Sequence, residues 1–323
     1  MSKSVLIMSS TSEIASALAK LYLSSNTTLL LHGRSEDKLN KLFSDLKSEY
    51  PSANIVKLPL MDLVSPVSEN LPDHEYASLL DRHYSSWFDS LVQKHGLPQT
   101  MVISAGGTSH GKYNPSTILE LNAVSAMKCC EQFIKKVRQH IHNEKYKHKQ
   151  FNILFMSSVA GENKDTMESL EGLSHYIYGL SKNVMNNYLA KLRQDIGKLN
   201  IRICNAKISF TNTNMLRAGM EARAKSMGSQ GFRATIKLAF TNWFVNQVII
   251  EPEQAAVELK HGLESGEDTF YVPGSAQYLA FFSTAGKSIF NFFINGIIFS
   301  LFFVPSVRSW AFGWIFKYIN SVL

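Results

Sequence analysis

Short apolar segments alternate with longer amphipathic segments along most of this chain. Apolar runs of this kind predict buried strands, and apolar residues recurring at intervals of three and four predict helices. Strands are expected at residues 5–8, 27–31, 54–60, 101–103, 154–158, 201–208 and 269–272. Helices are expected at about 14–22, 35–50, 72–98, 115–141, 174–195 and 252–263. Between residues 209 and 248 the pattern predicts a loop-rich, partly apolar stretch.

Strands that alternate with helices of this length form a parallel sheet with helices on both faces. We therefore expect an α/β fold, a Rossmann-like doubly wound parallel sheet of about seven strands, followed by a hydrophobic C-terminal helical tail. No Pro/Gly/Ser-rich linker separates two cores. This favours one domain over residues 1–275 and a tail over residues 276–323.

The tail stands out by its apolar composition. Ten of the 20 Phe residues lie between Phe281 and Phe316, and residues 288–307 contain no charged side chain. This run is about as long as a helix that crosses the hydrocarbon of a bilayer, and aromatic residues follow it as interfacial anchors do. The prediction is membrane attachment, either spanning or re-entrant. The alternatives are a hairpin packed on the first domain or on a second subunit, and an oligomerisation element.

The net charge of +7 permits attraction to anionic surfaces. Six basic residues gather in one stretch: Lys135, Lys136, Arg138, Lys145, Lys147 and Lys149. They predict a solvated helix end and loop, with anionic lipid headgroups as the alternative; nucleic acid is not expected, because no known binding module accompanies them. Cys129, Cys130 and Cys204 lack the spacing of metal ligands, so no metal site is expected. The N-terminus lacks a signal-peptide pattern, so the catalytic domain is expected to face the cytosol.

Ser158, Tyr178 and Lys182 carry the candidate chemistry. A Tyr and a Lys four positions apart share one face of a helix, so the ammonium can lower the pKa of the phenol. Ser158 ends an apolar strand and adds a hydroxyl that hydrogen-bonds a reacting oxygen, which completes a proton-transfer site for carbonyl or alcohol chemistry. Such a Tyr/Lys pair is also common as a core ring and a solvated amine, so the interpretation depends on the combination with the serine strand.

The serine strand followed by Tyr178-Gly179-Leu180-Ser181-Lys182 resembles the short-chain dehydrogenase/reductase family, over about residues 4 to 275. The resemblance implies that Tyr178 donates or accepts a proton, that Lys182 lowers its pKa and binds the ribose, and that Ser158 holds the carbonyl oxygen. Asn122, in the helix predicted at 115–141, matches an Asn that supports the catalytic Lys through water in relatives.

The first strand leads through a polar loop into a helix, a geometry in which backbone N–H groups and the helix dipole hold a phosphate. The family has three glycines here, at the positions of Ser9, Glu13 and Ala15. The loop is similar to the Gly-Ala-Thr-Ser-Asp-Ile-Ala variant of a subgroup that resembles reductases of lipid-linked keto sugars. If Ser9 adopts a positive φ, the cost is about 1 kcal/mol. The resemblance implies these cofactor-binding residues: Ser9, Thr11, Ser12, Glu13, Ile14, Arg34, Asp62, Ala105, Gly106 and Thr213.

Arg34 follows the second strand, which has no acidic residue at its end, and this favours the 2′-phosphate of NADP over the ribose of NAD. By the resemblance, Asp62 meets the adenine and Thr213 the nicotinamide end. Ser104 replaces the family's Asn, and the Pro-Gly expected before Thr213 is missing. Ser158 and Tyr178 are 20 positions apart, more than in most relatives, so residues around 162–171 are predicted to form a flap over the site.

Together these features predict a membrane-associated NAD(P)(H)-dependent oxidoreductase that interconverts a carbonyl and an alcohol on a lipid or lipid-linked substrate, with NADP favoured over NAD. The alternative is a catalytically weak cofactor-binding or scaffold protein at the membrane, suggested by Ser9, Ser104 and the missing Pro-Gly. Ketosphinganine reductases and retinol or steroid dehydrogenases also combine this fold with membrane segments, so substrate and reaction direction stay open. A homodimer is implied by the resemblance alone.

Overall fold

The computed structural model describes residues 3–23, 26–64, 72–108, 114–162, 173–197, 199–227 and 248–277. The chain divides into two units, Met1–Ala276 and Gln277–Leu323. Apart from its first two residues, the predicted tail therefore lies outside the described residues, as does the apolar segment 228–247. Within the described ranges, no helix combines the length and the apolar character needed to cross a membrane.

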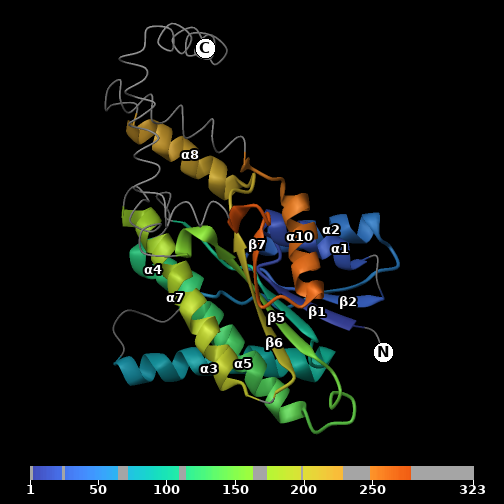
Figure 1. Ribbon diagram of the computed structural model, residues 1–323. Coiled ribbons are helices and arrows are strands. Elements are labelled where there is room, and N and C mark those ends of the chain that lie inside the picture. Colours follow the sequence, from blue (N-terminus) through green and yellow to red (C-terminus); the bar gives the residue numbers. More distant parts are fainter. Residues whose placement is uncertain are drawn as a thin grey trace, which may run out of the picture. The chain divides into compact units, whose positions relative to one another are not determined.

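One parallel sheet forms the centre of the first unit (Figure 1). Its seven strands follow the order β3-β2-β1-β4-β5-β6-β7. Their bounds are β1 Lys3–Met8, β2 Thr27–Leu31, β3 Asn54–Lys57, β4 Thr100–Ile103, β5 Phe151–Ser158, β6 Ile201–Ile208 and β7 Thr269–Val272. The strands are apolar because helices cover both of their faces. The predicted fold class of the first unit is thereby confirmed.

The helices divide between the two faces of the sheet. One face packs against α1 (Glu13–Leu23), α2 (Glu36–Glu49) and α10 (Pro252–Ser265). The other packs against α3 (Asp73–His95), α5 (Ser125–His140) and α7 (Leu173–Asp195). The short helix α4 (Pro115–Leu119) leads through a π-helical turn, η1 (Glu120–Val124), into α5, and a 3-10 turn, η2 (Val159–Gly161), follows β5. A further helix, α8 (Asn214–Met227), follows β6.

The structure departs from the sequence-based prediction at the end of β3, within the helix predicted at 115–141 and in the segment after β6. β3 ends at Lys57 rather than at residue 60, because its partner β2 ends at Leu31, which pairs with Lys57. The helix predicted at 115–141 contains the π-helical turn η1. The stretch expected to be loop-rich contains α8, whose polar sequence has little apolar periodicity.

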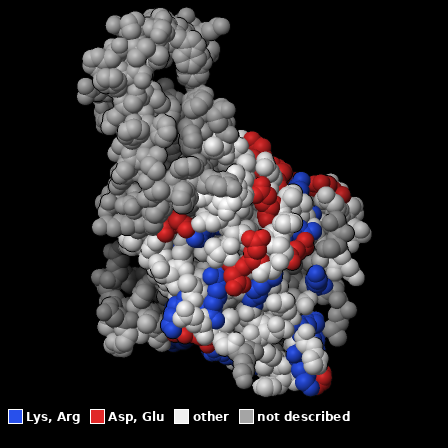
Figure 2. Space-filling view, in the orientation of Figure 1, with Lys and Arg blue, Asp and Glu red and all other residues white. Residues whose placement is uncertain are grey.

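The predicted basic cluster does not form one free surface. Lys136 is 4% exposed and its amine pairs with Asp89 of α3. The amines of Lys145 and Lys149 lie 5.2 and 5.7 Å from the centre of the Tyr146 ring. Figure 2 shows basic and acidic side chains interspersed over the described part of the face in view. The cluster is therefore engaged in part by protein groups, and a lipid headgroup surface stays a prediction.

Candidate functional site

The candidate site lies at the carboxyl ends of the central strands. In a parallel sheet all these ends share one edge, and ligands bind where the strand order reverses. Here the reversal falls between β1 and β4, which pair with each other. Ser9 follows β1 and Ser104 follows β4, so the two substituted family positions are neighbours.

Ser158 is the last residue of β5, and its hydroxyl caps η2 by accepting the N–H of Ala160 at 3.1 Å. The turn packs directly on α7, since a Cβ on Gly161 would lie only 2.6 Å from the backbone nitrogen of Asn183. The side-chain amides of Asn183 and Asn186 donate to the Gly161 carbonyl at 3.0 and 2.9 Å. This close packing brings Ser158 beside α7, close enough to Tyr178 to lower the pKa of its phenol.

Burial sets the electrostatics of Tyr178 and Lys182. It raises the pKa of the Tyr178 phenol, and the nearby Ser158 hydroxyl opposes that rise. It also lowers the pKa of the Lys182 amine to about 8. Lys182 is 3% exposed; its amine donates to the Met156 carbonyl at 3.2 Å and lies 5.8 Å from the centre of the Tyr178 ring. The phenol pKa is therefore shifted by burial and by Ser158, whereas the sequence predicted a shift caused by Lys182.

Asn122 lies in the π-helical turn η1 and is fully buried. Its side-chain oxygen accepts the N–H of Gly107 at 2.8 Å, and its amide donates to the Gly107 carbonyl and to the Ser181 hydroxyl, each at 3.0 Å. Ser181 in turn donates to the Tyr178 carbonyl at 2.6 Å. Asn122 thus joins the loop after β4 to the helix that carries Tyr178, and π-helical turns often mark functional positions.

Ser9 has φ 58°, the one positive φ among the non-glycine residues described. The strain predicted for this position is therefore present. A buried histidine holds the turn: the Ser9 N–H donates to Nδ1 of His32 at 3.2 Å. Since Nδ1 accepts this bond, the proton of the neutral ring is on Nε2, which donates to the Met61 carbonyl at 3.0 Å. Burial lowers the pKa of His32 to about 4, so the ring stays neutral at physiological pH.

Ser104 ties the ends of β1 and β4 together. Its hydroxyl lies 2.7 Å from the Met8 carbonyl and 3.0 Å from the Ser9 carbonyl, with Ser12 Oγ at 3.5 Å. Thr11 lies against Gly33, because a Cβ there would be 3.3 Å from its methyl group. Ile14 packs on the core beneath α1. The substituted loop therefore keeps a turn followed by the N-terminus of α1, whose first N–H groups have no partners within the helix.

Glu13 contacts a distant helix. Its carboxylate accepts the N–H of Asn214 at 2.7 Å and pairs with Arg217 at 2.9 Å, both in α8. Thr213 precedes α8 and its hydroxyl accepts the N–H of Leu216 at 3.4 Å. The loop before α1 and the segment that follows β6 are thereby brought together.

Arg34 and Asp62 lie close to each other, with 4.0 Å between Nη1 and Oδ1. Ala105 is buried, and Gly106 runs close to Lys182 and Asn122: a Cβ there would lie 3.2 Å from the Lys182 amine and 3.7 Å from Asn122 Oδ1. A glycine therefore leaves the space beside Lys182 open. The turn at Ser9, the start of α1 and this open space fit a dinucleotide.

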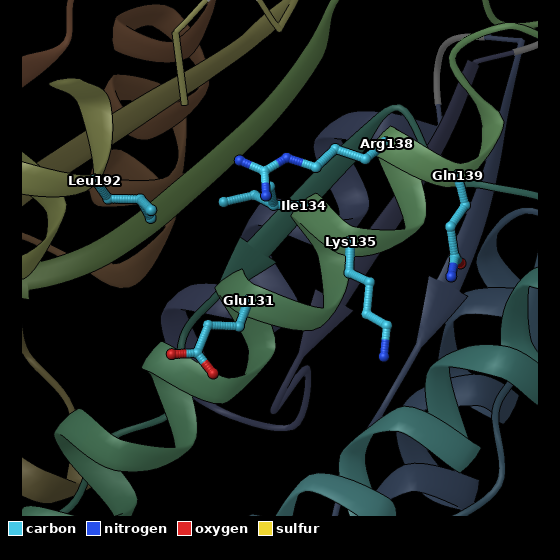
Figure 3. Close-up of a pocket in the computed structure, with 6 residues that line it drawn as sticks. All are labelled: Glu131, Ile134, Lys135, Arg138, Gln139 and Leu192. Atoms are coloured by element: carbon cyan, nitrogen blue, oxygen red, sulfur yellow. The ribbon is translucent and has the colours of Figure 1, made fainter. Parts of the chain in front are cut away.

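A surface hollow on the outside of the domain is separate from this site (Figure 3). Its lining residues are Glu131, Ile134, Lys135, Arg138 and Gln139 of α5 and Leu192 of α7. It contains none of the predicted site residues. Of the predicted flap, residues 162–171, only Glu162 is described, and it pairs with Lys207 at 2.7 Å; the rest of the flap lies outside the described residues.

Sequence reasoning missed His32, Ser181 and Arg217. His32 directly follows β2 and contacts Ser9 in the loop after β1, so its position at the end of a strand gave a signal. Ser181 is inside the Tyr/Lys motif itself. Arg217 gave none, because its partner Glu13 lies 204 positions away in the chain.

The profile of the short chain dehydrogenase family matches residues 3–224. Comparison with curated proteins finds no match. An actinorhodin polyketide ketoreductase variant, solved with NADPH, is 14% identical, with 85% of this chain and 97% of that chain covered and a TM-score of 0.62.

Two further solved structures have the same fold. A short-chain dehydrogenase from Sphingobium yanoikuyae, in complex with NADPH, is 16% identical over 89% of this chain and 95% of its own, with a TM-score of 0.59. A Shigella flexneri short chain dehydrogenase complexed with NADP is 16% identical over 83% and 96%, with a TM-score of 0.55. At these identities the structures support the fold, and the family profile supports the membership. The chain therefore belongs to the short-chain dehydrogenase/reductase family of oxidoreductases.

Proposed function

We propose that this protein interconverts a carbonyl and an alcohol on a lipid or lipid-linked substrate, with NADP(H) as cofactor and Tyr178 as general acid and base. The observation that carries the proposal is the buried Lys182 amine 5.8 Å from the centre of the Tyr178 ring, with Ser158 close enough to lower the pKa of the phenol. Two hydroxyls and an amine at the carboxyl edge of the sheet suit proton transfer to or from one oxygen atom.

The cofactor supplies the hydride in the reductive direction and accepts it in the oxidative direction. Tyr178 gives its proton to the carbonyl oxygen during reduction, and its raised pKa keeps the phenol protonated until then. Ser158 donates a hydrogen bond to the same oxygen as negative charge develops there. Protonated Lys182 then stabilises the phenolate through space. The amine is buried away from water, and this strengthens the attraction between the two charges.

Asn122 and Ser181 keep this arrangement in place. The Ser181 hydroxyl bonds to the backbone of Tyr178, and Asn122 bonds to both Ser181 and the loop after β4. These hydrogen bonds join η1, the loop after β4 and α7. We assign Asn122 a positioning role for Tyr178 and Lys182.

The NADP preference is supported by Arg34 at the end of β2, whose guanidinium matches a phosphate in charge and geometry. Asp62 beside it is the carboxylate proposed to meet the adenine. The structures with NADPH or NADP among the similar folds agree with this preference. We expect Arg34→Ala to weaken NADPH binding about tenfold or more while leaving NADH binding nearly unchanged.

The lipid substrate and the membrane association are supported by sequence alone. Residues 288–307 carry no charge, and seven apolar residues lie in the segment proposed to cover the substrate: Phe232, Ile236, Leu238, Phe240, Trp243, Phe244 and Val245. A carbonyl carried by a long apolar chain would be delivered from the bilayer surface. Partition of the full chain into the membrane fraction supports this part, and solubility without detergent would argue for an oligomerisation element.

The test of the cofactor proposal is titration of the detergent-purified full chain with NADPH and with NADH, followed by nicotinamide fluorescence. Tight binding of NADPH and weaker binding of NADH is the expected result. Tighter binding of NADH would overturn the role of Arg34. Binding of neither would refute the enzyme proposal and favour the scaffold alternative.

A further inference from the structure

Glu13 introduces a problem for any cofactor held at α1. The N-terminus of a helix attracts anions, and the pyrophosphate of a dinucleotide is expected there. Glu13 is the first residue of α1, so its carboxylate brings a negative charge to the place that the anion needs. Two like charges close together repel each other, and a cation beside them offsets this repulsion.

Arg217 of α8 supplies that cation. Its Nη2 pairs with Glu13 Oε1 at 2.9 Å. The guanidinium is held in position by α8 and the residues before it: Nη1 donates to the Asn212 carbonyl at 3.2 Å and to its side-chain oxygen at 2.5 Å, and Nη2 donates to Asn214 Oδ1 at 3.2 Å. The geometry therefore directs a fixed positive charge at Glu13.

The surroundings increase the need for this charge. A hollow beside the pair is lined by Glu13, Ser16, Asn212, Arg217, Glu251, Pro252 and Glu253. Among these seven lining residues three are glutamates and Arg217 is the one that is basic. Without Arg217, the charged residues lining this hollow would be three glutamates.

We propose that Arg217 is a positioning residue for the cofactor: by neutralising Glu13 it lets the N-terminus of α1 hold the pyrophosphate of a dinucleotide. The inference rests on the proposed function, since it concerns the same cofactor. It explains how this chain tolerates an acidic residue at a position where the three-glycine loop has a glycine and the similar subgroup loop has an Asp.

A purely structural latch between α1 and α8 is the competing explanation. The side chains of Arg217 and Glu13 are 47% and 34% exposed, and ion pairs this open contribute little to stability. A rescue experiment distinguishes the two explanations, because one concerns the affinity for an anionic ligand and the other concerns folding. Removing both charges restores neutrality at α1 but does not restore the latch.

The experiment compares the full chain with Arg217→Met, Glu13→Gln and the double variant Glu13→Gln/Arg217→Met. Binding of NADPH and of ADP-ribose, which carries the pyrophosphate without the nicotinamide, is measured by calorimetry at low and high salt. Lys191→Met is the matched control, because Lys191 pairs with Asp195 at the other end of α7, with 67% and 57% exposure. Thermal unfolding of each variant reports whether it folds.

We expect Arg217→Met to weaken both ligands about tenfold at low salt, and less at high salt. The affinities of the double variant should return to within about threefold of those of the parent protein. Lys191→Met should bind both ligands as tightly as the parent protein does. An unchanged affinity in Arg217→Met, or a double variant as weak as Arg217→Met, would overturn the inference alone. Failure of the parent protein to bind either ligand would instead refute the proposed function, and this inference with it.

Discussion

The burial of His32 predicts that the protein loses stability in acid. Its pKa falls from 6.5 to about 4 because the ring is buried. Between these values the unfolded chain binds a proton that the folded chain does not, so the free energy of unfolding decreases as the pH falls. The stabilisation is complete above about pH 6.5 and is lost as the pH approaches 4. At pH 4.5 the loss attributable to His32 is about 2.5 kcal/mol.

The matched variant is His32→Asn, whose side-chain oxygen can accept the Ser9 N–H but which does not titrate. Urea unfolding of the full chain in mild detergent, at about pH 7.5 and 4.5, gives the loss of stability for each protein. Trp87 is a suitable probe, since its ring lies 5.3 Å from that of His32. We expect the parent protein to lose about 2.5 kcal/mol more than the variant. Equal losses would show that His32 is not buried in its neutral form and would refute the reasoning.

Four further substitutions test the packing around the site. Ser9→Gly should raise the free energy of unfolding by about 0.5–1 kcal/mol in urea, since glycine adopts φ 58° without the Cβ cost; a loss would contradict the left-handed turn. Gly161→Ala should cost about 1–3 kcal/mol because the new Cβ meets α7, whereas Gly274→Ala, with nothing within 4 Å, should be nearly neutral; equal effects would contradict this packing. Asn122→Ala should cost about 2–3 kcal/mol in the same assay, because the N–H and carbonyl of Gly107 lose their partner; no loss would mean that water replaces the side chain.

The sequence was informative where a local pattern determines the structure. Parallel strands buried on both faces are apolar throughout, so their positions were predictable, and a spacing of four places Tyr178 and Lys182 on one helix face. The end of β3 was not predictable, because it depends on where its partner β2 stops. Nor was the π-helical turn around Asn122, whose residues are also compatible with an α-helix.

Contacts between distant segments account for the rest. The resemblance included Glu13 among the cofactor-binding residues, but Arg217, its partner in α8, has no local sequence signature. The positive φ of Ser9 was anticipated, whereas its support by His32 depends on how the ends of β1 and β2 meet. Burial raises the pKa of Tyr178, and the spacing of Tyr178 and Lys182 in the sequence does not report burial.

The most direct test of the central claim is the turnover of Tyr178→Phe. NADPH oxidation is followed with a panel of long-chain aldehydes and ketones, and NADPH affinity is measured on the same preparations. We predict that the parent protein reduces at least one of these carbonyl compounds. Tyr178→Phe should lose activity about 100-fold or more while its NADPH affinity stays within about twofold. Undiminished turnover in this variant, or no reduction of any carbonyl compound by the parent protein with NADPH bound, would contradict the account.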